Sequence, residues 1–590
     1  MERWVLLRKG ADFEKIGKKY QISPRLACLI RNRNVIGDEE INRYLNGTIN
    51  DLYDGMLMKD MDKTVDILKE KIEENKKIRI IGDYDIDGVN ATYILLEGLE
   101  RLGADVDSDI PDRMRDGYGL NRDLVERAYE AGVDTIVTCD NGIAASSEIT
   151  YGKEKGMTVL VTDHHEVPYE ETEDGRSYIL PPADAVIDPK QADCMYPFSG
   201  LCGAAVAYKL MEALWESMGK DSSDLDDLIE NVAIATIGDV MDLEEENRIF
   251  VKEGLQMLKR TSNLGLKALI ECTGIEKEHL NSYHIGFVLG PCINASGRLD
   301  TAKRALELLR AKTKKEADIL AGDLKALNDS RKDMTADAVE QAKEQVELSA
   351  MKKDRVLVIY LPDCHESLAG IVAGRIRESY YKPVFVLTDA EEDVKGSGRS
   401  IDGYHMYEEL NKCKHLLTKF GGHRLAAGLS LEKENVDTLR EMLNANCRLT
   451  EEDLKEKVTI DMEMSFANVT ENMVEELSLL EPFGKGNTKP VFAARNVKVL
   501  NGRVLGKNRN VLKMQVQDTA GTVIEAMLFQ KVEEFLKEIE DVYGTHSVEM
   551  FLQGRQADIR LALTYYPDIN EYMGRKTPQI VISHYRFAVR

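Results

Sequence analysis

Cysteine is scarce in this sequence and is nowhere paired. The nine cysteines are scattered along 590 residues, and no two of them are separated by only two residues. A zinc ribbon needs closely spaced pairs, and a disulfide framework uses an even number of cysteines in a short chain. Neither kind of fold is therefore indicated, and we expect reduced thiols, several of them buried.

Long apolar runs are also missing. No stretch approaches the roughly 20 apolar residues that span a bilayer, and residues 1–20 contain no apolar run followed by a small-residue cleavage site. We therefore expect a cytoplasmic protein without a membrane partner. Proline is rare, with 14 residues, whereas 43% of the chain is hydrophobic and 31% is charged, which is typical of a folded, helix-rich protein.

Basic residues are outnumbered by acidic ones. The 78 Lys and Arg against 103 Asp and Glu give a net charge of −25, which repels a polyanion at long range. This balance argues weakly against nucleic-acid binding. Local clusters of Lys and Arg decide the question, because an acidic surface can still contain one basic groove.

The order of hydrophobic patterns predicts a multidomain α/β protein. Short β-branched runs at 78–81, 135–139, 158–162 and 185–187 alternate with helical stretches, which predicts a parallel sheet in a Rossmann-like αβα domain. Residues 301–350 have dense charge, a single glycine and no proline, which predicts a long helix joining two lobes.

A second α/β lobe and a small β-barrel are predicted beyond this helix. Strand and helix patterns resume at 356, and short strands at 497–500, 511–516, 523–528 and 547–552 with Gly-rich turns favour the barrel. The predicted parts are an N-terminal helical region (1–70), the αβα domain (71–300), the connecting helix (301–350), the second α/β domain (351–450) and the barrel (451–590).

Three aspartates follow the first strand at alternate positions. Asp83, Asp85 and Asp87 stand directly before Gly88, so three carboxylates crowd a tight turn and repel one another unless a cation binds. A solvated acidic turn and a calcium loop are the alternatives. An EF-hand requires a helix before its loop, however, whereas a strand precedes this one.

The next strands end in similar polar groups. One is followed by Asp140-Asn141-Gly142 and the next by Asp163-His164-His165, while Asp239 follows a further apolar run. The carboxyl ends of parallel strands meet at one edge of a sheet, so these side chains should converge. Carboxylates and imidazoles without thiolates suit Mn²⁺ or Mg²⁺, and two such ions could activate water for attack on a phosphodiester.

These motifs resemble the DHH phosphoesterase superfamily and, within it, the bacterial RecJ exonucleases. The resemblance rests on Asp83 to Gly88, on the Asp-Asn-Gly and Asp-His-His triplets, and on further motifs in the same order along the chain. The further motifs are at 111–113, 116–120, 290–298 (GPCINASGR), 421–428 (GGHRLAAG) and 482–487 (PFGKGN).

The resemblance implies roles for individual residues. The metal ligands, for two Mn²⁺ or Mg²⁺ ions, would be Asp83, Asp85, Asp87, Asp140, His164 and Asp239, and the catalytic residues His165, Asp140 as the bridge between the ions, and Arg298. The second lobe resembles the DHHA1 domain, and its His423 would lie in the substrate cleft. Its Ser397 and Arg399, together with Arg113 of the αβα domain, would bind a 5′-phosphate. The barrel resembles an OB-fold with a nucleic-acid-binding stripe of Arg503, Lys507, Arg509 and Lys513.

The expected function is that of a metal-dependent 5′ to 3′ exonuclease. It would degrade single-stranded DNA to mononucleotides in repair and recombination, as a monomer that a helicase and a single-strand-binding protein could assist. One alternative is a phosphodiesterase of short oligonucleotides or cyclic dinucleotides, which would not need residues 451–590. The other is a non-catalytic nucleic-acid-binding scaffold, which would have lost ligands that this sequence keeps.

Overall fold

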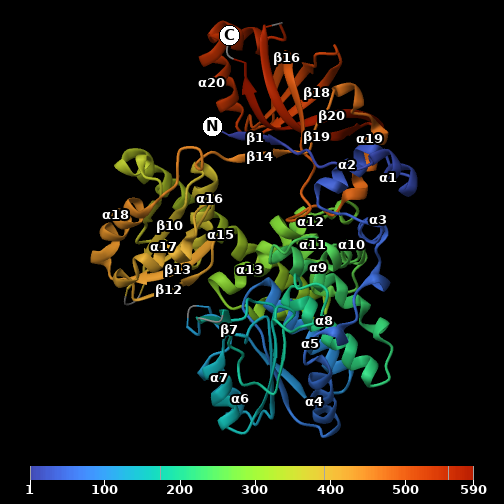
Figure 1. Ribbon diagram of the computed structural model, residues 1–590, viewed down its shortest axis with the longest axis vertical. Coiled ribbons are helices and arrows are strands. Elements are labelled where there is room, and N and C mark those ends of the chain that lie inside the picture. The colour runs from blue at the N-terminus through green and yellow to red at the C-terminus, as the bar shows by residue number, and fades with distance from the viewer. Residues whose placement is uncertain (1, 114, 173–174, 391–392, 556, 589–590) are drawn as a thin grey trace. The chain divides into compact units, whose positions relative to one another are not determined.

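The computed structural model describes residues 2–113, 115–172, 175–390, 393–555 and 557–588 (Figure 1). The chain forms two compact units. The first unit contains residues 52–241 and 246–456, and the second contains residues 2–51, 242–245 and 457–590. Within the described residues, no helix is both long enough and apolar enough to cross a membrane.

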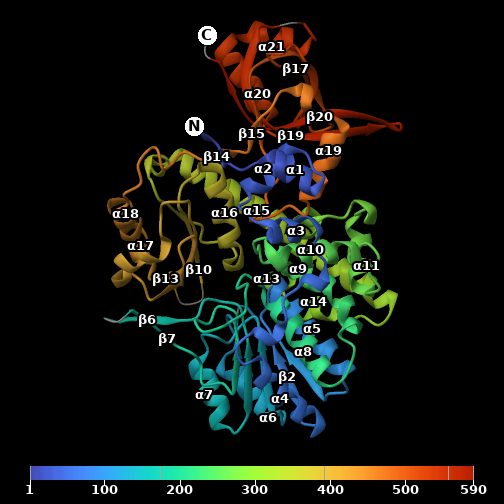
Figure 2. The same cartoon turned by 45° about the vertical axis from the view of Figure 1, so that its right-hand side comes forward.

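The first unit contains the predicted parallel sheet. Its strand order is β3-β2-β4-β5-β8, and every neighbouring pair is parallel. Helices α6 and α7 cover one face of the sheet, and α4, α5 and α8 lie on the other (Figure 2). The strands are β2 (Ile78–Ile81), β3 (Val106–Asp109), β4 (Thr135–Cys139), β5 (Thr158–Thr162) and β8 (Ala185–Ile187), and the helices are α4 (Met61–Glu73), α5 (Ile86–Arg101), α6 (Arg122–Glu130), α7 (Ser146–Glu154) and α8 (Gly203–Ser217).

Helix α5 is buried over most of its length. Apolar residues occur all round it, so it cannot face solvent along one side as α6 does. It packs between the sheet, α8 and α9 (Ile229–Gly238). This packing fixes the N-terminus of α5, where Asp83, Asp85 and Asp87 form the acidic cluster.

The predicted long helix is confirmed as α15 (Lys314–Leu348), which has 35 residues. Thr313 caps its N-terminus, because its side chain accepts a hydrogen bond from the backbone N–H of Glu316. A separate short helix, α14 (Lys303–Leu309), precedes it. Small buried residues such as Ala317, Ala321 and Ala342 let neighbouring elements approach α15 closely.

The second lobe of the first unit contains a mixed sheet of order β12-β13-β11-β10-β9. Strands β9 (Leu357–Tyr360) and β10 (Val384–Asp389) are parallel, and the other pairs are antiparallel. The remaining elements are β11 (Val394–Arg399), β12 (Lys419–Gly422), β13 (Ala426–Leu431), α16 (Ala369–Tyr380), α17 (Met406–Lys412) and α18 (Val436–Asn446).

The second unit contains the predicted OB-like barrel. The strand order of its sheet is β15-β16-β17-β18-β20-β19, with the short strand β15 (Met462–Glu463) parallel to β16. Pairing of β16 with β19 closes the barrel. Strand prediction was wrong at 547–552, which belongs to helix α21 (Thr545–Leu552), because Phe551 packs under Gly502 in the barrel core. The elements are β16 (Phe492–Leu505), β17 (Val511–Gln517), β18 (Val523–Phe529), α20 (Val532–Tyr543), β19 (Ile559–Tyr572) and β20 (Arg575–Phe587).

Residues near the N-terminus belong to the same core as the barrel. Leu26, Leu29 and Ile30 of α2 (Pro24–Asn32) share a hydrophobic cluster with Phe466 and Phe492. Strand β1 (Arg3–Leu6) pairs in parallel with β14 (Lys457–Ile460). The second unit is therefore assembled from both ends of the described chain.

Candidate metal centre and phosphate pocket

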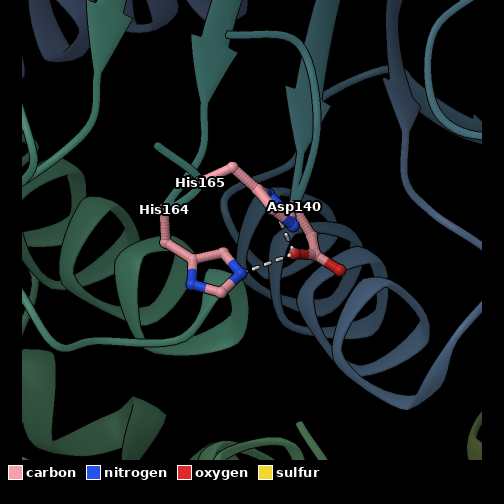
Figure 3. Close-up of side chains that lie close together, drawn as sticks. All are labelled: Asp140, His164 and His165. Carbon is pink, nitrogen blue, oxygen red and sulfur yellow. Dashed lines mark hydrogen bonds and ion pairs between the residues drawn. The ribbon is translucent and has the colours of Figure 1, made fainter. Parts of the chain in front are cut away.

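The carboxyl ends of β2, β4 and β5 bring the predicted ligands together. Three groups have ligand atoms within 4.8 Å of one another: Asp140, His164 and His165; Asp87, His164 and Asp239; and Asp83, Asp85 and Asp140. Every side chain that we predicted as a metal ligand belongs to one of these groups. Figure 3 shows both histidines turned toward the carboxylate of Asp140.

Two helix N-termini hold the acidic cluster in place. Asp85 caps α5 by accepting hydrogen bonds from the backbone N–H groups of Asp87 (2.9 Å) and Gly88 (3.1 Å). The buried carboxylate of Asp87 accepts from the N–H groups of Gly203 (2.7 Å) and Ala204 (2.8 Å), where α8 begins. Both helix ends carry positive partial charge, which stabilises the carboxylates at these positions.

Close backbone approaches require small residues around the centre. A Cβ on Gly88 would overlap the carbonyl oxygen of Asp83, and one on Gly203 would lie 2.7 Å from Cβ of Asp140. Asp140 itself has a left-handed backbone with φ of 60°, which is uncommon for a residue other than glycine. Such strain is typical of functional sites.

Burial and mutual repulsion disfavour ionised carboxylates here. Burial raises the pKa of Asp83 and Asp140 well above the usual value, and the charges of Asp85 and Asp87, respectively, add to this effect. The same causes raise the pKa of Asp87 to about 7 and that of Asp239 to about 8. A divalent cation would relieve this repulsion.

His164 has the properties of a neutral ligand. Burial lowers its pKa to about 3, and the neighbouring charge of His165 contributes to the shift. Its Nε2 lies 3.0 Å from Asp140 Oδ1, 3.5 Å from Asp87 Oδ2 and 3.9 Å from Asp239 Oδ2. The buried Oδ2 of Asp83 has no hydrogen-bond partner among the described residues. This set of oxygen and nitrogen donors fits Mn²⁺ or Mg²⁺.

His165 is held differently, by a partner that favours its protonated form. Burial lowers its pKa, but the hydrogen bond and charge of Asp163 outweigh this and raise the pKa to about 9. Its Nδ1 lies 2.7 Å from Asp163 Oδ1, and its Nε2 lies 3.0 Å from the hydroxyl of Tyr118. Asp163 also accepts from the backbone N–H groups of Ile143 (2.9 Å) and His164 (2.7 Å), so its own position is fixed.

Two residues at this edge of the sheet were not singled out from the sequence. Tyr118 lies in the motif at 116–120, but nothing in the sequence placed its hydroxyl beside His165. Asp188 directly follows β8, is fully buried, and has an Oδ2 without a partner among the described residues. Burial, followed by the charge of Asp163, raises its pKa to about 8. The rule that ligands follow strands could have identified Asp188.

A cavity of about 530 Å³ lies within the first unit and reaches Tyr84. Tyr84 lies in the segment 83–87 that carries the acidic cluster, which we call the acidic loop. Its lining includes Arg113, Arg298, Ser397 and Arg399, which we predicted as catalytic or substrate-binding residues. The described lining residues do not include His423, which is exposed on the turn after β12. The other lining side chains include Glu366, Ser367, Thr388, Lys395, Lys419, Phe420 and Ser430.

The arginines of this cavity repel one another. Burial lowers the pKa of Arg298 to about 10, and the charge of Arg113 contributes. Burial and the charges of Arg377 and Arg113 likewise lower the pKa of Arg399. Arg298 donates to the carbonyl oxygen of Ser367 (2.8 Å), and Arg399 donates to Ser397 Oγ (3.2 Å). Guanidinium groups gathered in this way can donate hydrogen bonds to a phosphate in pairs, so the cavity is a candidate phosphate site.

The predicted basic stripe lies on one hairpin of the second unit. Arg503 in β16 stands opposite Lys513 in β17, and Lys507 and Arg509 lie in the turn between these strands. Lys513 is paired with Glu525 at 2.9 Å, so part of its charge is already neutralised. The other three side chains are exposed.

Three segments of the sequence match known families. Residues 77–236 match the DHH family, N-terminal domain; residues 353–449 match the DHHA1 domain; and residues 460–584 match the RecJ OB domain. These segments correspond to the parallel-sheet domain, the second lobe and the barrel.

Whole proteins are similar as well. The single-stranded-DNA-specific exonuclease RecJ of Bacillus subtilis strain 168 is 35% identical over 585 residues, which cover 98% of this chain and 70% of that protein. A crystal structure of RecJ from Thermus thermophilus in complex with Mn²⁺ has a TM-score of 0.82 at 26% identity, covering 99% of this chain and 79% of the other. A structure of the Thermus protein with Mg²⁺ has a TM-score of 0.77 at 24% identity, with coverages of 99% and 78%. The chain therefore belongs to the RecJ family of single-stranded-DNA-specific exonucleases.

Proposed function

We propose that this protein hydrolyses single-stranded DNA from its 5′ end and releases mononucleotides, in repair and recombination. The observation that carries the proposal is the junction of the arginine-lined cavity with the acidic loop. Tyr84 lines the cavity and stands between Asp83 and Asp85 in the sequence. A terminal phosphate bound in the cavity would place a phosphodiester bond of the same strand near the carboxylates.

The carboxylates of Asp83, Asp85, Asp87, Asp140 and Asp239, together with His164 Nε2, would hold two Mn²⁺ or Mg²⁺ ions. Such ions lower the pKa of an attacking water and neutralise charge on the phosphate. Asp140 has ligand atoms in two of the three groups, which supports its role as the shared ligand. The helix N-termini that bind Asp85 and Asp87 orient these ligands before any ion is bound.

Cationic side chains complete the proposed mechanism. His165 is protonated at neutral pH because Asp163 raises its pKa, so it can donate a hydrogen bond to a phosphate oxygen as negative charge develops there. Arg298, whose guanidinium is fixed by the carbonyl of Ser367, can donate to the same group. Asp163 and Tyr118 act as positioning residues, because both contact the His165 ring.

The cavity supports a preference for the 5′ end. A terminal phosphate monoester carries about two negative charges at neutral pH, whereas an internal phosphodiester carries one. Arg113 and Arg399, aided by Ser397, would therefore bind the terminal group more strongly. The Arg113 guanidinium is held 4.9 Å from the centroid of the Tyr84 ring, beside the acidic loop.

The organisation of the chain supports further parts of the proposal. We propose that residues 71–300 form the catalytic domain, that 351–450 bind the strand end, and that the barrel within 451–590 binds nucleic acid through the stripe. The domain at 1–70 and the helix at 301–350 would be structural. A helicase would have to open duplexes, a single-strand-binding protein could present the strand, and the protein would act as a monomer.

The decisive experiment compares single strands labelled at either end. Mononucleotide release from the 5′ label in Mn²⁺ or Mg²⁺, faster with a 5′-phosphate than with a 5′-hydroxyl, is expected. Arg399→Ala should remove the advantage of the 5′-phosphate, whereas Arg375→Ala, outside the cavity lining, should keep it. Release only from the 3′ end, or faster turnover of dinucleotides than of long strands, would overturn the proposal in favour of another phosphodiesterase activity.

A further inference from the structure

Two large aromatic side chains are exposed and stacked on each other in the first unit. Tyr283 is 61% exposed and Phe287 is 64% exposed. Their ring centroids lie 4.9 Å apart with an interplanar angle of 25°. Removing aromatic rings from water is favourable, so a stacked pair that stays exposed to solvent indicates a surface that contacts a ligand. We call this pair the aromatic platform.

A rigid turn presents the platform. Tyr283 lies in α12 (Ser282–His284), and Phe287 lies in the π-helical turn η5 (Ile285–Leu289), which leads directly into α13 (Gly290–Leu299). The side chain of Asn281 caps the turn by accepting from the N–H groups of Tyr283 (3.1 Å) and His284 (3.4 Å). Ile285 and Leu289 are buried on either side, so Phe287 has to face outward. π-Helical turns are frequent at functional sites.

The same turn packs against the end of the helix that supplies Asp239. A Cβ on Gly286 would lie 3.5 Å from Cγ2 of Ile237, which is two residues before Asp239 in the sequence. Figure 1 shows α9, α12 and α13 together, and the contacts of η5 with all three agree with that view.

Ile86 ties this assembly to the acidic loop. Its side chain packs against Gly238, at the end of α9, and against Gly290, at the start of α13. Its backbone N–H donates to Asn294 Oδ1 of α13 at 2.9 Å. Because Ile86 lies between Asp85 and Asp87, the platform and the metal centre share one packed scaffold.

Exposed apolar surface also occurs directly beside the metal ligand. Val240 follows Asp239, is 60% exposed and has a left-handed backbone with φ of 58°. Glycine is the usual residue at this position after a helix, and a β-branched residue is strained there. Strain of this kind persists where a side chain serves a site. Uncharged contact surface therefore lies beside a centre of carboxylates and imidazoles.

We propose that the aromatic platform stacks on bases of the single strand close to the metal centre. The inference rests on the proposed function, because it adds a base-binding site to the phosphate-binding cavity. A base offers a π-face whatever its identity, so stacking holds a strand without selecting its sequence. Tyr283 and Phe287 are thus substrate-positioning residues.

The test measures nucleotide release from a 5′-phosphorylated oligothymidylate in Mn²⁺. Tyr283→Ala and Phe287→Ala should each raise KM by about five-fold or more, with a much smaller change in kcat. Tyr283→Phe, which keeps the ring, should behave as the unaltered protein does. Tyr129→Ala is the matched control, because Tyr129 is 45% exposed on α6 and takes no part in either site. Thermal unfolding checks that each variant is folded.

A strand with abasic positions near its 5′ end provides the second readout. Removing a stacked base should raise KM for the unaltered protein. In the alanine variants it should raise KM little further, because the abasic position and the alanine substitution delete the same contact. Alanine variants with unaltered KM, or a fully additive abasic effect, would overturn the inference while leaving the exonuclease assignment intact. An unaltered protein that releases no nucleotides would instead overturn the proposed function.

Discussion

At the scale of single residues, the candidate metal centre is assembled from groups that destabilise one another. Four carboxyl groups, on Asp83, Asp87, Asp140 and Asp239, have raised pKa values because they have lost water and face like charges. Two N-terminal helix turns compensate for part of this cost. The part of this free-energy cost that is not compensated makes the stability of the metal-free protein dependent on pH.

The first prediction concerns that pH dependence. A raised pKa means that the folded protein holds its proton more tightly than the unfolded chain does. The resulting stabilisation is complete below about pH 4 and is lost as pH rises through about 7 for Asp87 and about 8 for Asp239. With a chelator present, the Tm should therefore fall by several degrees between about pH 5 and about pH 8.

Added Mn²⁺ should restore the Tm most strongly at the higher pH, because the ion replaces the lost protons. Asp85→Asn removes the neighbouring charge that raises the pKa of both Asp87 and Asp239, so it should flatten the pH dependence of the chelated protein while abolishing hydrolysis. Scanning fluorimetry at matched ionic strength provides the measurement. A chelated protein as stable at about pH 8 as at about pH 5 would contradict the electrostatic description of the centre.

The second prediction concerns Asp163. Its hydrogen bond and charge keep the His165 pKa at about 9, so the imidazolium is present up to that pH. In Asp163→Asn the pKa should fall toward its ordinary value of 6.5, and the alkaline limb of the kcat profile should move to lower pH. Near pH 8 we expect a loss of about 10- to 100-fold in kcat.

A matched variant in the same sheet separates this effect from general damage. Asp107 pairs with Arg79 through its carboxylate, at 2.6 Å, away from His165. Asp107→Asn should keep the alkaline limb where it is, even if it lowers stability. A loss of activity in Asp163→Asn that is uniform across pH would show that the residue only supports the fold.

At the scale of elements, strand ends were predictable and helix packing was not. Each of the strands β2, β4 and β5 is a short apolar run that leads into Asp or His, so the sequence alone placed Asp83, Asp140 and His164 at one edge. The contact of Asp87 with the start of α8 involves residues more than 110 positions apart. No local pattern encodes such a contact, because it depends on how α5 and α8 pack.

Other elements show the same limit. The segment at 547–552 has the composition of a strand, yet it forms a helix because Phe551 packs under Gly502 in the barrel core. The π-helical turn at 285–289 also has no local signature. Its outward Phe287 is explained only by the burial of Ile285 and Leu289 against other elements.

The third prediction tests the approach of α8 to the acidic cluster. Gly203→Ala would place a Cβ 2.7 Å from Cβ of Asp140, so either α8 or Asp140 has to move. The hydrogen bonds from Gly203 and Ala204 to Asp87 would then weaken. Mn²⁺ affinity, measured by calorimetry, should fall about ten-fold or more, which corresponds to about 1.4 kcal/mol, although no ligand is removed.

Gly322→Ala provides the control for this glycine substitution. Gly322 lies within α15, and a Cβ there would meet nothing within 4 Å. Alanine should leave Mn²⁺ affinity unchanged and stabilise the helix by up to about 1 kcal/mol. Equal Mn²⁺ affinities of the two variants would show that the close approach of α8 does not position the ligands.

At the scale of the whole molecule, net charge was a poor guide to the site. A charge of −25 argues against binding a polyanion, yet the cavity gathers Arg113, Arg298 and Arg399 within one unit. These residues lie up to 286 positions apart, and the sequence indicated their proximity only through resemblance to a family. The folded chain gathers basic side chains in one cavity despite its negative net charge, so composition alone could not identify this arginine-lined surface.

The last prediction concerns the division into two units. Residues 2–51 and 457–590 share one hydrophobic core, in which Leu26, Leu29 and Ile30 of α2 and Ile41 and Tyr44 of α3 (Asp38–Asn46) are buried. Burial of each such side chain contributes about 1.5–3 kcal/mol. A fragment of residues 1–456 would therefore lose about 10 kcal/mol of this burial and expose the apolar faces of α2 and α3.

A fragment of residues 52–456 lacks those helices and keeps the cores of the parallel-sheet domain and the second lobe. It should elute as a single species in size-exclusion chromatography and bind Mn²⁺, whereas the longer fragment 1–456 should aggregate. The shorter fragment is thus expected to be the more soluble and monodisperse of the two, although removing residues from a folded protein usually has the opposite effect. If fragment 1–456 is monodisperse and 52–456 is not, the N-terminal helices support the first unit rather than the barrel.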